Sequence, residues 1–322
     1  MASEFRIKDR LVGEEHPVYV IGEIACGHQG DPEQAVKLID AVADAKADAA
    51  QLQIFDYRAN VAPTAPIYKL LQDISFDRKT WFRLADHVRD RGVALSLFVY
   101  DEPSMELALE LKPDMLKLNS SELSNPVLVV GAARSGLPFT IGTGSSTFDE
   151  IGKALSWIKT ENALDRVVLM HGVQNFPTAP ETAEIARVKL LRDVFRLPVI
   201  YADHTPGGDP LALSIDMVAL GAGACMVEKH LVLDRSKEGV DWQASLQPEE
   251  FAIYVANMRA ASSAIGDARP RQFNEQDLRY RRFQKKSLVS AGNLPQGHKL
   301  SAGNFRFLRV QGDREGISPA DS

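Results

Sequence analysis

The sequence predicts a closed (β/α)8 barrel, the TIM-barrel class of α/β folds, followed by a short carboxyl-terminal extension. Eight short runs of apolar and β-branched residues recur along the chain, each followed by a segment with helical periodicity. The runs begin roughly 20 to 45 residues apart, which is the spacing of parallel strands joined by helical crossovers. Eight units in about 250 residues favour a closed barrel over an open doubly wound sheet, which usually has fewer strands.

The eight predicted strands share a length of four to seven residues and a nearly continuous apolar character, which is typical of strands buried on both faces. We expect them at residues 18–24, 49–54, 94–99, 115–119, 139–142, 167–171, 199–203 and 224–228.

The boundaries of the intervening helices carry local signals. Asp31 precedes Pro32, which predicts a capped helix start, and Asp209 before Pro210 repeats the pattern. Thr147 with Glu150 three residues later predicts a capping box. Glycines that end helices just before the next strand are Gly92, Gly136 and Gly221.

Composition excludes several classes of function. The 37 lysines and arginines against 43 aspartates and glutamates give a net charge of −6, so we expect no nucleic-acid partner. No apolar run reaches the length that spans a membrane, and no signal peptide is predicted. Two cysteines cannot form a disulfide framework, which favours a cytoplasmic location. The chain also lacks GxGxxG and GxxxxGK[ST] motifs, so neither nicotinamide binding nor P-loop hydrolysis is predicted.

Reactive residues follow the predicted strands at their carboxyl ends, which share one face of a barrel. They are Glu23, Lys117, Asn119, Ser120, Glu122, Thr143, His171, Asp203, His204, Glu228 and His230. An active site is therefore expected on this face.

His204 and His230 close adjacent strands and could present their imidazole nitrogens to one metal ion. Such ligands suit manganese, zinc or iron better than magnesium. The carboxylate of Asp203 or Glu228 could orient one of these imidazole rings without binding the metal itself. His171 is left open between a ligand and a structural residue.

Lys117 projects from a barrel strand and could serve as a Schiff-base lysine or as a fixed cation for an anionic substrate. The small residues of 142–146 favour phosphate or carboxylate binding, although the same turn could simply join a strand to a helix. Glu23 ends an apolar strand, which favours an acid–base or substrate-binding role. Cys26 and Cys225 are interpreted as small core residues.

These residues resemble a known family, the N-acetylneuraminate (sialic acid) synthases and their relatives for other nonulosonic acids. The similarity runs from about residue 18 to residue 266 and is carried, in order, by IGEIACGHQGDPEQAVKLIDAVADAKADAAQLQ, LKLNSSELSNPVL, TGSSTFDEI, LMHGVQNFPT, ADHTPGGDPLAL and VEKHLVLDRSKEGVDWQASLQPEEF. The last two segments are the most specific.

The resemblance implies an enzyme of surface carbohydrate biosynthesis that condenses phosphoenolpyruvate with an N-acylated aldose, giving a nonulosonic acid and phosphate. It implies a divalent metal, usually manganese, held by His204 and His230. The implied catalytic residues are Glu23, Glu122 and Asp241. The implied substrate-binding residues are Lys117, Ser120, Asn125, Thr143, Gln174 and Gln51.

The chain departs from the family pattern at several positions that normally hold phosphoenolpyruvate. Gln51 stands in place of the lysine of VKFQ, and apolar residues near Phe98 replace the threonine of STPF. Gly142 replaces the serine of STG, Ala202 the serine before the Asp-His pair, and Phe176 the tyrosine before PTP. One cation and several hydroxyls are therefore missing from the implied anion site.

We expect three parts in the chain: the synthase barrel at 1–267, a linker at 268–284, and a partial antifreeze-like (SAF) module at 285–322. Two short strands are expected in the last part, at 287–291 and 305–310. The segment resembles only the opening of the family's carboxyl-terminal domain, without the half that includes the arginine reaching into the partner's site. The resemblance implies a homodimer.

Two alternatives stay open at this point. The first is a divergent metal-dependent barrel lyase or aldolase that keeps Lys117 and the metal but does not use phosphoenolpyruvate. The second is a non-catalytic sugar-binding subunit, which the retained Glu23, Asp241 and histidines disfavour.

Overall fold

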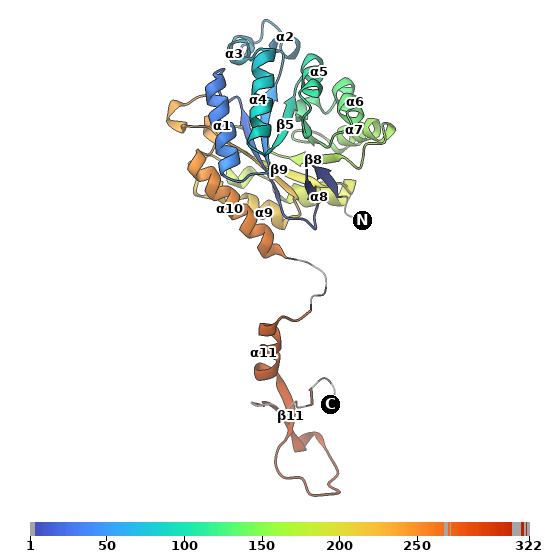
Figure 1. Ribbon diagram of the computed structural model, residues 1–322. Helices are drawn as coiled ribbons and strands as arrows, with labels where there is room; N and C mark the ends of the chain where they lie inside the picture. The colour runs from blue at the N-terminus through green and yellow to red at the C-terminus, as the bar shows by residue number, and fades with distance from the viewer. Residues whose placement is uncertain (1–3, 267–269, 271, 311–316, 319, 321–322) are drawn as a thin grey trace. The chain divides into compact units, whose positions relative to one another are not determined.

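The structure is a computed structural model that describes residues 4–266, 270, 272–310, 317–318 and 320. The chain divides into two compact units, Met1–Gly266 and Asp267–Ser322, which are described separately. The first unit is a barrel wrapped by helices (Figure 1).

Eight parallel strands form the closed barrel, in the order β10-β3-β4-β5-β6-β7-β8-β9. They are β3 (Tyr19–Ala25), β4 (Ala49–Ile54), β5 (Ala94–Val99), β6 (Met115–Leu118), β7 (Phe139–Gly142), β8 (Val167–His171), β9 (Val199–Asp203) and β10 (Met226–His230). The predicted fold class and all eight predicted strands are confirmed. The largest boundary error is in β10, which begins and ends two residues later than predicted.

Helices on the outside of the barrel follow the strands. They are α1 (Pro32–Asp44), α2 (Tyr57–Asn60), α3 (Tyr68–Ile74), α4 (Arg78–Asp90), α5 (Glu102–Glu110), α6 (Pro126–Arg134), α7 (Phe148–Thr160), α8 (Ala186–Phe195), α9 (Asp216–Gly221) and α10 (Pro248–Ile265). Short 3-10 turns are η1 (Ser120–Glu122), η2 (Pro180–Thr182), η3 (Pro210–Leu213), η4 (Arg235–Lys237) and η5 (Trp242–Ala244).

The predicted caps are present where regular helices form. The Asp31 side chain accepts the backbone N–H of Glu33, and Thr147 and Glu150 make a reciprocal capping box. Asp209 also caps, but the segment that it begins is the 3-10 turn η3, and α9 starts only at Asp216. The Asp-Pro signal therefore predicted the turn correctly and the type of helix wrongly.

The hydrophobic core has two layers. One lies between the strands and the helices, and the other fills the barrel interior near its amino-terminal end. A hairpin of β1 (Phe5–Ile7) and β2 (Arg10–Val12), which the sequence analysis did not predict, contributes Phe5, Ile7 and Val12 to the inner layer. The hairpin closes the end of the barrel opposite the strand ends where the reactive residues lie.

The second unit contains α11 (Glu275–Gln284), β11 (Lys286–Ser290), the 3-10 turn η6 (Ala302–Asn304) and β12 (Phe305–Arg309), and the two strands pair antiparallel. The two predicted strands are confirmed. The predicted linker differs from the structure, because α11 lies within it. Asn274 and Asp277 make a capping box that the polar composition of the segment concealed. The division at 267 and 284 stays a prediction.

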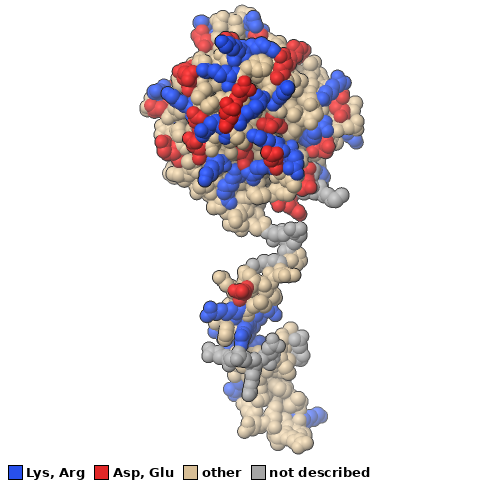
Figure 2. All heavy atoms as spheres, viewed as in Figure 1, with Lys and Arg blue, Asp and Glu red and all other residues tan. Residues whose placement is uncertain are grey.

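Surface charge on the barrel unit is mixed. On the face in view, lysine and arginine side chains alternate with aspartate and glutamate side chains rather than gathering into one basic patch (Figure 2). None of the described helices is long and apolar enough to cross a lipid bilayer.

Candidate active site

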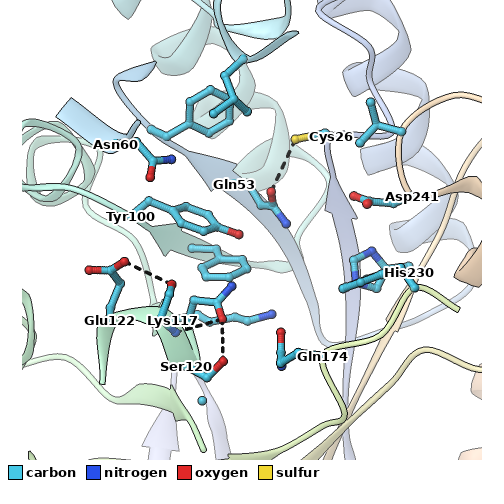
Figure 3. Close-up of a pocket in the computed structure, with 18 of the residues that line it drawn as sticks. Cys26, Gln53, Asn60, Tyr100, Lys117, Ser120, Glu122, Gln174, His230 and Asp241 are labelled. Atoms are coloured by element: carbon cyan, nitrogen blue, oxygen red, sulfur yellow. Dashed lines mark hydrogen bonds between the residues drawn. The ribbon is translucent and has the colours of Figure 1, made fainter. Parts of the chain in front are cut away.

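A cavity of about 480 Å³ opens at the carboxyl ends of the barrel strands. Seven of the residues that the resemblance assigns to the site line it: Lys117, Ser120, Glu122, Gln174, His204, His230 and Asp241. Asn119 and Glu228, predicted from their strand-end positions, line it as well. Figure 3 shows Lys117, Ser120 and Glu122 on one side of the cavity and His230 and Asp241 on the other. Residues from strands far apart in the sequence are thus brought together.

Lys117 on β6 is the one positively charged side chain among the described residues that line the cavity, histidines aside. Its Nζ lies 2.5 Å from Glu228 Oε1 and 3.2 Å from Glu23 Oε2. It also lies 4.1 Å from the centre of the Phe98 ring. Burial acts to lower the pKa of Lys117, but Glu228 and Glu23 outweigh it and raise the pKa above its usual value. These contacts favour the interpretation of Lys117 as a fixed cation over that of a Schiff-base lysine.

Glu23 lies near the carboxyl end of β3, two residues before its last residue Ala25, and is fully buried beneath the cavity. Burial raises the pKa of Glu23 to about 7, against the opposing influence of Lys117. A carboxyl with this pKa can hold or release a proton near neutral pH.

Gln51 on β4 is also buried below the cavity rather than on its wall. Its Nε2 donates to Glu228 Oε2 at 2.7 Å and to a Glu23 oxygen, and its Oε1 accepts from the Ser96 hydroxyl at 2.7 Å. All of its hydrogen-bonding groups are thus engaged within the protein. Gln51 holds the two carboxylates in place, and direct binding of substrate stays a prediction.

The two histidines have the geometry of a ligand pair. Their ring centres lie 5.3 Å apart, and His204 Nδ1 lies 2.8 Å from the Val173 carbonyl oxygen. That hydrogen bond places the proton on Nδ1 and leaves Nε2 with a lone pair. Burial lowers the pKa of both rings, well below the usual value for His230. Both imidazoles are therefore neutral, as metal ligands must be.

These residues fit a divalent metal. His230 Nδ1 is buried and has no hydrogen-bond partner among the described residues, which would be costly without a ligand. In the part of the chain that the structure describes, no group of three or more His, Cys, Asp or Glu side chains is arranged to hold an ion. A metal here would take two protein ligands and fill its remaining positions with substrate or water.

The turn η1 after β6 orders the polar wall. Asn119 caps the turn, and the Ser120 hydroxyl donates to Asn119 Oδ1 at 3.0 Å. Asn125 does not line the cavity, because its Oδ1 caps α6 and its Nδ2 donates to Glu122 Oε2 at 2.9 Å. Asn125 positions Glu122 instead of touching the cavity itself.

Gln174 and Asp241 also line the cavity, in loops after β8 and β10. Asp241 adopts a left-handed backbone conformation with φ of 62°, and burial raises the pKa of its carboxyl. Thr143 does not reach the wall, since its hydroxyl donates to the Met170 carbonyl at 2.8 Å and the side chain is buried. The sequence shows only that Thr143 is small and lies at a strand end, and neither property predicts this internal hydrogen bond.

Three aromatic side chains also line the cavity: Phe98 and Phe176, which stand where the chain departs from the family pattern, and Tyr100, which was not predicted to belong to the site. Phe98 and Tyr100 stack with ring centres 4.4 Å apart, and the Phe176 ring lies 4.0 Å from that of His204. Tyr100 directly follows β5, so its strand-end position was a usable signal. Cys26 also lines the cavity, and burial raises the pKa of its thiol, which agrees with its interpretation as a non-nucleophilic residue.

Comparison with known proteins identifies the family and the relatives that this chain resembles. The model of the NeuB family matches residues 38–270. The N,N'-diacetyllegionaminic acid synthase of Legionella pneumophila is 28% identical, across 96% of this chain and 89% of that protein. The spore coat polysaccharide biosynthesis protein SpsE of Bacillus subtilis is 26% identical, across 98% of this chain and 90% of its own length.

A solved structure agrees with these relatives. The N-acetylneuraminic acid synthetase of Leptospira borgpetersenii superimposes with a TM-score of 0.81 and 26% identity, covering 87% of this chain and 97% of that one. This chain belongs to the NeuB family. The predicted resemblance to the sialic acid synthases, and with it the prediction of a synthase-type enzyme of surface carbohydrate biosynthesis, is confirmed at the level of this family.

Proposed function

We propose that this protein condenses phosphoenolpyruvate with the open-chain form of an N-acylated aldose, giving a nonulosonic acid and inorganic phosphate. One observation carries the proposal: a single cavity joins the Lys117 ammonium to the neutral His204–His230 pair. The first group suits an anionic donor, and the second suits an ion that binds a carbonyl oxygen.

Lys117 would hold the anionic end of the donor. Its ammonium is charged, lies at the cavity wall and has three donors, of which Glu228 and Glu23 engage two. The Ser120 hydroxyl and the polar η1 turn beside it supply neutral hydrogen-bonding groups. This arrangement orients the donor without forming a covalent bond to it.

The residues fit manganese better than magnesium, because two of the ligands are imidazoles. An ion held by His204 and His230 would polarise the aldehyde of the acceptor sugar.

The bond changes balance with water as the one further reactant. The methylene carbon of the donor forms a bond to the aldehyde carbon, whose oxygen takes up a proton. Water then adds to the cationic carbon that bears the phosphate ester oxygen and loses a proton. Cleavage of that carbon–oxygen bond releases phosphate, which takes up the proton of the new hydroxyl group, and leaves the keto group. The pKa of Glu23 is raised to about 7, which supports the assignment of proton transfer to this buried carboxyl group.

Glu122 and Asp241 lie on facing walls of the cavity, which supports their assignment to proton transfer and sugar binding. Gln174 supports sugar binding in the same way. Asn125, Thr143 and Gln51 remain in the proposal as residues that hold the site together from behind its wall.

Phosphate release tests the proposal. Phosphoenolpyruvate is incubated with a panel of N-acylated aldoses, with manganese and with a chelator. We expect aldose-dependent phosphate release that requires the metal and is abolished in His204→Ala. If no aldose supports release, the proposal fails.

A second function is favoured by one observation. Lys117 is already paired with two carboxylates, and Gln51 is neutral, so the described wall offers little uncompensated positive charge to a phosphate. This favours the alternative of a metal-dependent lyase or aldolase whose donor is a less charged enol. Formation of a carbon–carbon bond from pyruvate without phosphate release would identify it.

The location and the oligomeric state of the enzyme are also proposed. We infer a cytoplasmic enzyme that acts on small molecules, as a homodimer, with the extension after the barrel as a partial antifreeze-like module. Sedimentation of the full chain tests the dimer.

A further inference from the structure

The cavity has a second half that the proposed chemistry does not use. Its wall is formed by six side chains between residues 55 and 74, here called the apolar roof: Phe55, Val61, Ile67, Leu70, Leu71 and Ile74. Leu70, Leu71 and Ile74 belong to α3. Phe55, Val61 and Ile67 lie in the segments beside α2 and α3, within the crossover between β4 and α4.

The apolar roof packs separately from the core of the barrel. Leu71 and Ile74 form a small buried cluster with Cys26, against which Phe55 and Val61 pack. Ile67 and Leu70 line the cavity but are 47% and 42% exposed. A ligand that reached the roof would remove this apolar surface from water, which is favourable in proportion to the area covered.

The part of the cavity that carries the proposed chemistry, formed by Lys117, Glu228, His204 and His230, is here called the reactive floor. A row of aromatic rings connects the reactive floor to the apolar roof. Lys117 Nζ lies 4.1 Å from the Phe98 ring centre, Phe98 stacks on Tyr100 at 4.4 Å, and Tyr100 meets Phe55 edge-on at 6.5 Å. The floor and the roof are therefore parts of one continuous wall. A substrate whose aldehyde lies on the floor can extend its other end to the roof.

Two neutral amides mark the border between the halves. Asn60 and Gln53 both line the cavity, and Figure 3 shows Asn60 beside Tyr100. Gln53 Oε1 accepts from the Cys26 thiol at 3.4 Å, whereas the Asn60 side chain has no hydrogen-bond partner among the described residues. No charged side chain lies among the described lining residues from 53 to 74. This part of the wall suits an uncharged amide followed by an apolar group.

We propose that the apolar roof binds the N-acyl group of the acceptor aldose and selects an acyl chain longer than acetyl, with Asn60 hydrogen-bonding the acyl amide. The inference rests on the proposed function for the identity of the substrate, and it adds the class of substituent that the enzyme prefers.

The test uses N-acetyl, N-butanoyl and N-hexanoyl derivatives of one aminohexose, reduced to the alcohol so that no aldehyde can react. Each is titrated calorimetrically onto the full-length protein with manganese, both with and without phosphoenolpyruvate. We expect the hexanoyl compound to bind at least about tenfold more tightly than the acetyl compound, because each added methylene leaves water.

A matched pair of variants isolates the roof. Leu70→Asn should abolish the dependence of affinity on chain length, whereas Leu190→Asn should leave it intact. Both leucines are 42% exposed, but Leu190 lies on α8 and does not line the cavity. Their high exposure means that both variants should fold, which thermal unfolding would verify.

The outcomes separate this inference from the proposed function. Equal affinity for all three chain lengths, or no binding under either condition, overturns the roof assignment even if the enzyme releases phosphate. Affinity that rises with chain length but disappears in Leu190→Asn also overturns it. Absence of phosphate release overturns the condensation but not a measured preference for longer chains.

Discussion

The Nζ of Lys117 lies 2.5 Å from a carboxylate oxygen of Glu228 and 3.2 Å from one of Glu23. The two carboxylates come from β10 and β3, which pair with each other, while Lys117 reaches them across the barrel from β6. The reactive floor is therefore a buried ionic cluster that exists before substrate binds. An anionic donor must share Lys117 with these carboxylates.

Removing the Lys117 cation should lower both the free energy of unfolding and the affinity for the donor. Lys117→Met leaves two buried carboxylates without their partner, so we expect a loss of about 3 kcal/mol in the free energy of unfolding and at least about tenfold weaker donor binding. Lys37→Met, on the exposed side of α1, is the control and should change neither. Denaturant unfolding and donor titration measure both effects; unchanged donor affinity in Lys117→Met would show that the ammonium is not the anion site.

Restoring a second cation should improve donor binding. Gln51→Lys would place an ammonium beside Glu23 and Glu228 and free part of Lys117 for the donor. We expect KM for phosphoenolpyruvate to fall about tenfold, by the strength of one charge-assisted hydrogen bond. Gln51→Met is the comparison, since it removes the amide without adding charge. A KM that does not fall in Gln51→Lys would place the donor's anionic groups away from β4.

The floor should not tolerate a side chain at Gly142. A Cβ at this position would lie 2.4 Å from the Ser120 backbone nitrogen, so Gly142→Ser should displace η1 and cost about 2 kcal/mol in the free energy of unfolding. Gly152→Ala is the matched control, because a Cβ there meets nothing within 4 Å and the residue lies inside α7. That variant should be neutral or slightly stabilising. Equal stability of the two variants would mean that the turn can shift freely.

Stability should depend on pH through His28. Burial lowers the pKa of His28 to about 4, and its ring lies 4.3 Å from that of Phe76. The pKa of His28 is lower in the folded protein than in the unfolded chain. The contribution of the neutral His28 ring to the free energy of unfolding is therefore complete above about pH 6.5 and is lost as the pH falls toward 4. The total loss should be about 3 kcal/mol.

His28→Gln should flatten this part of the curve of unfolding free energy against pH, whereas His298→Gln, at an exposed position in the second unit, should not. An identical pH slope in His28→Gln and the wild type would rule out His28 as the source.

The fold could be predicted from the sequence because its signals are local and repeated. Each buried strand is a short apolar run. Asp31 and Thr147 mark helix starts because their side chains accept hydrogen bonds from backbone N–H groups of the first helical turn. The β1–β2 hairpin was missed because three-residue strands leave too little periodicity, and α11 because its polar composition resembles a linker.

The site was predicted in part. Strand-end position was sufficient to find Lys117, His204 and His230, since parallel strands of a barrel deliver their carboxyl ends to one face. It could not distinguish Thr143, whose hydroxyl turns to a backbone carbonyl, from residues that reach the cavity. It also gave no sign of the apolar roof, because α2 and α3 contact the site only through the tertiary fold.

The most direct test of the condensation follows one oxygen atom. Phosphoenolpyruvate labelled with oxygen-18 at the bridge between carbon and phosphorus is turned over with an N-acylated aldose, and the released phosphate is observed by phosphorus NMR. Cleavage of the carbon–oxygen bond predicts that all of the label appears in phosphate. Label found instead in the sugar acid, or no phosphate from any aldose, would contradict the account.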